Sequence, residues 1–87
     1  MSKQIDLVSL GGLKPGACGV VNAFGAAPDQ VTADMIDRLR EIGFAEGLKV
    51  ELLHQSLFGK DPIAVRIGTM TVALRRKEAN LIKVQLA

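Results

Sequence analysis

The feature that most constrains the fold is a change of hydrophobic period within RLREIGFAEGLKVELL, residues 38–53. From residue 35 to residue 42, apolar residues recur at helical spacing. From residue 48 onward, apolar and polar residues alternate as in a strand. The helical set is Met35, Ile36, Leu39 and Ile42. The chain must therefore pass from a helix into a strand within a few residues, which requires a well-defined turn.

Gly43 is expected to end this helix, because a glycine after the last turn adopts a left-handed conformation at little steric cost. Phe44 would then pack on Leu39, which is the hydrophobic contact of a Schellman ending. At the other end we expect Thr32 to be the N-cap, with Val31 packing on the following turn.

Five segments have the composition and alternation of strands: 17–24, 48–53, 63–67, 70–74 and 82–86. Gly68 and Thr69 predict a type II′ hairpin turn between two of them, and residues 75–80 predict a short helical turn. The pattern predicts a mainly β chain of about five strands, with one α-helix inserted after the first strand and a short helical turn before the last. Closure into a small closed or half-closed barrel would remove exposed strand edges.

The composition favours one soluble domain over residues 1–87, with a formal net charge of only +2. No segment approaches the roughly 18 apolar residues of a membrane span, and the first residues lack the pattern of a signal peptide. The single cysteine, Cys18, cannot form an internal disulfide. We therefore expect a cytoplasmic protein that does not insert into a membrane.

No combination of nucleophile, base and stabilising group stands out, so the sequence predicts no enzyme, catalytic residue, cofactor or metal site. His54 has no second histidine to join it and is expected at the surface or at a strand end. A metal site shared between copies in an oligomer could still recruit it. Cys18 lies among small apolar residues and is expected to pack as an inert side chain.

Three groups of side chains are candidates for binding a partner protein. They are the charges Asp34, Asp37, Arg38 and Glu41 on the helix, the loop residues Leu57 and Phe58, and Arg75 with Arg76 in a basic run. Each has a simpler interpretation: a solvated helix face, an apolar plug of the barrel and a solvated turn. The basic run lacks neighbouring aromatics for stacking on bases, and Glu78 balances it.

The order and spacing of these motifs resemble the ferrous iron transport protein A (FeoA) family over nearly the whole chain. The residues that carry the resemblance are Arg38, Leu39, Gly43, Phe44, Gly47, Asp61, Pro62, Ala73, Leu74, Arg75, Glu78, Ala79, Ile82 and Val84. The resemblance implies an SH3-like β-barrel with a helical insert. It also implies a cytoplasmic regulatory protein that contacts the cytoplasmic part of the ferrous iron transporter FeoB.

The residues themselves are also compatible with two alternative functions. One is a small nucleic-acid-binding barrel that uses the basic run, although nucleic acid is not the expected partner. The other is a metal-sensing domain, similar to the C-terminal domain of iron-dependent repressors, that uses His54, Cys18 and the acidic helix face. An exposed strand edge would also allow homo-oligomers.

Overall fold

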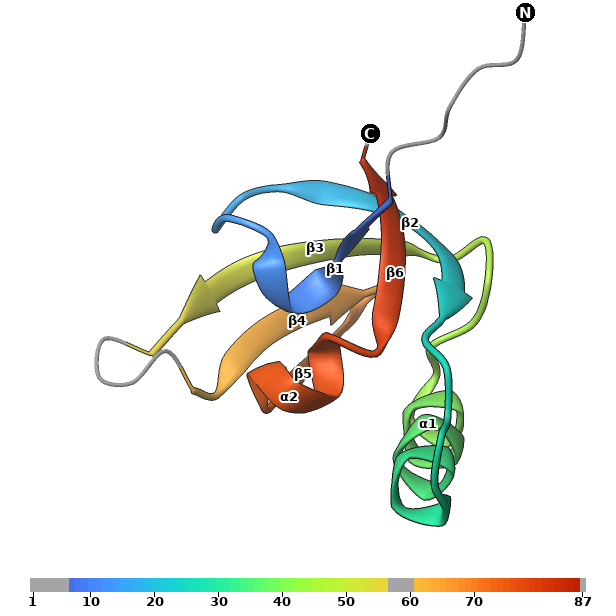
Figure 1. Ribbon diagram of the computed structural model, residues 1–87. Coiled ribbons are helices and arrows are strands. Elements are labelled where there is room, and N and C mark those ends of the chain that lie inside the picture. The colour runs from blue at the N-terminus through green and yellow to red at the C-terminus, as the bar shows by residue number, and fades with distance from the viewer. Residues whose placement is uncertain (1–6, 57–60, 87) are drawn as a thin grey trace, which may run out of the picture.

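Figure 1 shows the computed structural model of the chain, which describes residues 7–56 and 61–86. The elements in chain order are β1 (Leu7–Ser9), the 3-10 turn η1 (Leu10–Gly12), β2 (Cys18–Phe24), α1 (Gln30–Ile42), β3 (Lys49–Gln55), β4 (Ile63–Ile67), β5 (Met70–Leu74), α2 (Arg76–Ala79) and β6 (Ile82–Leu86). The mainly β class is confirmed, and the five expected strands, the helix and the short helical turn are all present.

The structure adds one strand, β1, that the sequence did not predict, so α1 follows the second strand rather than the first. Three residues are too few to establish an alternating pattern. β1 exists because it pairs with β6, where Val8 lies opposite Val84 at the other end of the chain. Its formation depends on tertiary contact rather than on its own sequence.

The six strands form one antiparallel sheet in the order β1-β6-β2-β3-β4-β5. β6 runs between β1 and β2, so the last strand of the chain pairs with the first two (Figure 1). Register shifts at Val21/Ala23 in β2 and at Leu52/His54 in β3 interrupt the ladders, and such irregularities bend a sheet. β1 and β5 remain as the two outer strands, which is the half-closed form of the expected barrel.

Among the described residues, the buried core is aliphatic apart from Phe44, as the scarcity of aromatics in the sequence leads one to expect. No polar or charged side chain is buried within residues 7–56 and 61–86. The largest fully buried side chains are Phe44, Leu10, Leu39, Leu52, Ile63, Ile82, Val21, Val50, Val65 and Val84. Burial of this surface is the main stabilising contribution to the fold.

The predicted helix ending is confirmed. The Phe44 N–H donates to the Leu39 carbonyl oxygen at 3.1 Å, and the Gly43 N–H donates to the Arg40 carbonyl oxygen at 3.1 Å. These are the two hydrogen bonds of a Schellman motif, and Gly43 has the positive φ of 133° that favours glycine there. Leu39 and Phe44 are both fully buried in the core, so the helix end also fixes the start of the next segment.

The predicted helix start was wrong by one turn. Asp29 is the N-cap, and its carboxylate accepts a hydrogen bond from the Thr32 N–H at 2.8 Å. Thr32 therefore lies inside the first turn and donates to the cap instead of serving as one. Val31 is 66% exposed, so it does not pack on the next turn. The carboxylate acceptor of Asp29 was available one turn earlier, and aspartate is at least as good an N-cap as threonine.

The hairpin between β4 and β5 has the predicted two-residue loop, because Ile67 lies opposite Met70. Gly68 has a φ of 59°, the positive value required at the first loop position.

The expectation that Cys18 packs inside was wrong: its side chain is exposed. Its neighbour Gly19 occupies the inward position, where an added Cβ would lie 2.5 Å from Val84 Cγ1. Adjacent strand residues face opposite sides, so the thiol points outward.

Candidate functional site

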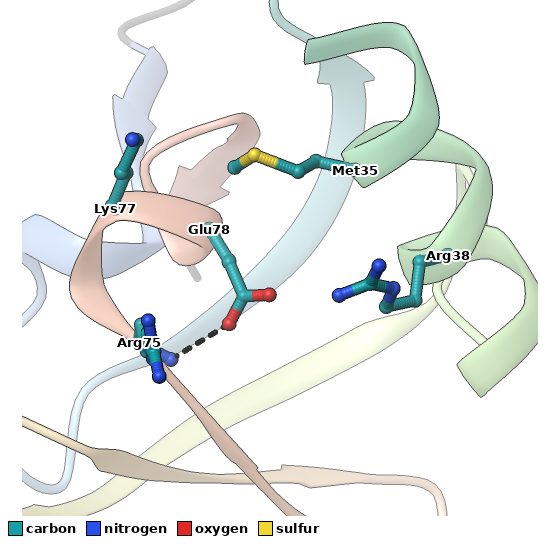
Figure 2. Close-up of a pocket in the computed structure, with 5 residues that line it drawn as sticks. All are labelled: Met35, Arg38, Arg75, Lys77 and Glu78. Carbon is teal, nitrogen blue, oxygen red and sulfur yellow. Dashed lines mark hydrogen bonds between the residues drawn. The ribbon is translucent and has the colours of Figure 1, made fainter. Parts of the chain in front are cut away.

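A charged cleft of about 340 Å³ lies between α1 and α2. Met35 and Arg38 line it from α1, and Arg75, Lys77 and Glu78 line it from the start and body of α2 (Figure 2). The two helices are adjacent in space although 33 residues of the chain separate Ile42 from Arg76 in sequence. We refer to these five residues as the interhelical cleft.

The α1 side of the cleft follows from helical geometry. Leu39 is fully buried and fixes which side of α1 faces the core. Met35 and Arg38 are three residues apart and therefore project from the same flank of the helix. Met35 is half-buried and Arg38 is exposed, so this flank changes from apolar to charged as it leaves the core.

Local hydrogen bonds shape the α2 side. Glu78 Oε1 accepts from the Arg75 N–H at 3.0 Å, and Asp61 Oδ1 accepts from the Arg76 N–H at 2.7 Å. Both carboxylates satisfy N–H groups that the first turn of a helix leaves without a helical partner. Figure 2 shows that the Glu78 carboxylate and the Arg38 guanidinium point toward each other across the cleft.

The structure differs from the expected solvated turn at Arg76. Its guanidinium is part-buried and donates to the Gly11 carbonyl oxygen and to Gln55 Oε1. Sequence inspection could not separate Arg76 from its neighbours, because both acceptors lie far away along the chain. Arg75 and Lys77 are exposed on either side of it.

The cations of the cleft make no ion pair with the described residues, although Lys77 is near enough to Asp29 to help lower the pKa of that carboxyl. Ion pairs join Arg40 to Glu46 at 3.1 Å and Arg66 to Glu51 at 3.8 Å. None of the residues that the structure describes makes an ion pair with the cleft cations, which are Arg38, Arg75 and Lys77. The cleft can therefore accept an anionic group without first breaking an internal ion pair.

The acidic side chains of α1 do not line the cleft. Asp34, Asp37 and Glu41 are exposed, and none of them lines it. Asp34 Oδ1 accepts from the Gln30 side-chain amide at 2.8 Å. The structure thus brings Arg38 and Arg75 to the same cleft, whereas Asp34 and Glu41, four and three residues from Arg38, share its side of the helix but do not line the cleft. Leu57 and Phe58 lie outside the described residues.

A second hollow on the outer face of the sheet contains Cys18, with Lys49, Glu51 and Arg66 around it. His54 is exposed and lies further along β3. Within the two described ranges, no three side chains of the types His, Cys, Asp and Glu are grouped closely enough to hold a metal ion. Of the helices in those ranges, none has the length and apolar character needed to cross a membrane.

The model of the FeoA domain family matches residues 8–86, almost the whole chain. This chain belongs to the FeoA family. The family membership confirms the resemblance found in the sequence and the place of the family in ferrous iron transport. Comparison with curated proteins gave no significant match.

Solved structures of two FeoA proteins are similar over most of both chains. Stenotrophomonas maltophilia FeoA, determined in complex with zinc, is 30% identical with a TM-score of 0.73, covering 90% of this chain and 89% of that chain. It is described as an SH3 domain protein and is suggested to be a bacterial ferrous iron transport activating factor. Chlorobium tepidum FeoA is 32% identical with a TM-score of 0.74, covering 91% of this chain and 70% of that chain.

A manganese-dependent transcriptional repressor has the same fold in part of its length. It is 22% identical with a TM-score of 0.81, and the match covers 98% of this chain but only 44% of the repressor. At this identity the similarity establishes a shared fold alone. The FeoA fold therefore also occurs as one portion of a larger regulatory protein.

Proposed function

We propose that this FeoA-family chain is a cytoplasmic accessory protein of bacterial ferrous iron uptake. In this proposal it regulates the transporter FeoB by contact with the cytoplasmic part of FeoB, and it catalyses no reaction. The observation that carries the proposal is the family match over residues 8–86. The description of the Stenotrophomonas maltophilia protein as a candidate transport activating factor supports the same role.

The surface of the chain suits contact with another protein. Arg38 and Arg75 are exposed and make no ion pair within residues 7–56 and 61–86, so we propose that they contact the partner. Arg76 would contribute by holding α2 in place through its bond to Gly11. The acidic face of α1 and the residues Leu57 and Phe58 remain predicted contact sites.

The test is titration of the folded chain with the purified cytoplasmic part of FeoB, followed by calorimetry and by chemical-shift mapping. We expect saturable binding, with shift changes confined to one face of the chain. A lack of association at tens of micromolar, with both proteins folded, would contradict the proposal. A duplex DNA oligonucleotide at low salt is the control for nonspecific binding by the basic residues.

A further inference from the structure

We infer that the interhelical cleft binds an acidic segment of the partner protein, with a partner carboxylate held among Arg38, Arg75 and Lys77. This inference rests on the proposed function, because it names the surface and the chemistry of that contact. Arg38 comes from α1, whereas Arg75 and Lys77 come from the start of α2 (Figure 2). A bound carboxylate would therefore link two elements that are distant in sequence.

The distribution of charge supports an anionic ligand. The chain has 11 basic and 9 acidic residues and a formal net charge of +2. The cleft contains three of the basic residues and one of the acidic residues, so the other eight basic and eight acidic residues cancel. The cleft thus has a formal net charge of +2, which attracts an acidic segment before contact is made.

The donor geometry suits a carboxylate. A guanidinium presents paired N–H donors whose spacing matches the two oxygens of a carboxylate, and the cleft has two such groups. Because neither guanidinium is ion-paired within the described residues, binding requires no exchange of partners. Met35 supplies a half-buried thioether beside them, which can adapt to an apolar residue next to the acidic one.

Two features of the cleft favour an acidic protein segment over nucleic acid. Glu78 already places one carboxylate at the cleft, and a phosphate chain would meet this repulsion at each of several charges, whereas an acidic segment need place only one carboxylate there. Binding of unpaired bases also requires exposed aromatic rings for stacking. Phe44 is buried, the Phe24 ring has the Arg40 guanidinium 4.2 Å from its centroid, and neither ring lines the cleft.

The experiment measures the affinity of the full chain for the cytoplasmic part of FeoB with two charge-matched double variants. R38E/R75E reverses two cations of the cleft, whereas K49E/R66E reverses two exposed cations around the separate hollow at Cys18. Both variants change the net charge equally, and circular dichroism confirms that each is folded. We expect R38E/R75E to weaken binding at least about tenfold and K49E/R66E to weaken it less than about threefold.

Equal affinities for wild type and R38E/R75E would overturn the inference and leave the proposed function intact. Equal weakening by both variants would also overturn it, because only the net charge would then matter. If the wild type itself does not bind, the proposed function fails together with this contact. Binding of the wild type to vesicles with anionic lipids or to duplex DNA, but not to the FeoB domain, would likewise reject an acidic protein segment.

Discussion

The Arg76 guanidinium donates a hydrogen bond to the carbonyl oxygen of Gly11, a residue 65 positions earlier in the chain. The same guanidinium donates to Gln55 Oε1 in β3. Arg76 therefore links α2 to η1 and to the sheet. Arg76 thus stabilises the fold, whereas its neighbours Arg75 and Lys77 are exposed.

Replacing Arg76 with alanine should lower the free energy of unfolding by about 1.5–3 kcal/mol, the range for hydrogen bonds to a charged group. The loss arises because the Gly11 carbonyl, which belongs to a buried residue, is left without this donor. Urea denaturation measures the change. K77A is the matched control and should stay within about 0.5 kcal/mol of wild type, because Lys77 is exposed. Similar losses in both variants would show that Arg76 has no special structural role.

Replacing Gly19 with alanine should destabilise the protein by about 1–3 kcal/mol or more through overpacking. The new methyl group would contact Val84 Cγ1 at 2.5 Å and press on the Gln85 carbonyl oxygen of β6, which is backbone and cannot easily move. Thermal or urea unfolding would detect the loss. C18A changes the adjacent, outward-facing residue and should be nearly neutral. A neutral G19A variant would mean that β6 shifts without cost.

The helix cap should make stability depend on pH in the acid range. Hydrogen bonds from the Thr32 hydroxyl and backbone N–H hold the pKa of the Asp29 carboxyl below its ordinary value of 3.8. Because the pKa is lower in the folded state, the ionised carboxylate stabilises the protein at pH values above 3.8. This contribution is lost as the pH falls from 3.8 through the lowered pKa of the folded state. The free energy of unfolding should therefore decrease with acid more in wild type than in D29N.

D29N is the appropriate comparison because asparagine is an equally good N-cap but does not titrate. Urea unfolding at a series of pH values from neutral to strongly acid gives the two curves. The difference in free energy of unfolding between wild type and D29N should change only below about pH 4. Parallel curves over the whole range would contradict the contribution of Asp29.

The Cys18 thiol should react with a small alkylating reagent or a disulfide reagent while the protein is folded, because its side chain is exposed. We expect one equivalent of label per chain under native conditions, with an unchanged circular dichroism spectrum. C18S should give no labelling and is the control for side reactions. Labelling that appears only after denaturant is added would contradict the outward orientation of the thiol.

Sequence reasoning succeeded where the signal was local. The Schellman ending at Gly43, the hairpin at Gly68 and the helical turn after Arg75 depend on residues within a few positions of one another. The failures had two causes. At the helix start two nearby residues, Asp29 and Thr32, can each serve as the N-cap, and Asp29 does so, whereas β1 forms only by pairing with the end of the chain.

The sequence by itself determined the family, the mainly β class and every helix and strand except β1, because period and turn chemistry act over short distances. Only the tertiary structure decided which charged and reactive side chains face outward. It turned Arg76 inward to Gly11 and Cys18 outward, and it brought Arg38 beside Arg75. The physical reason is that these orientations depend on which distant backbone groups need a donor and where a Cβ can fit.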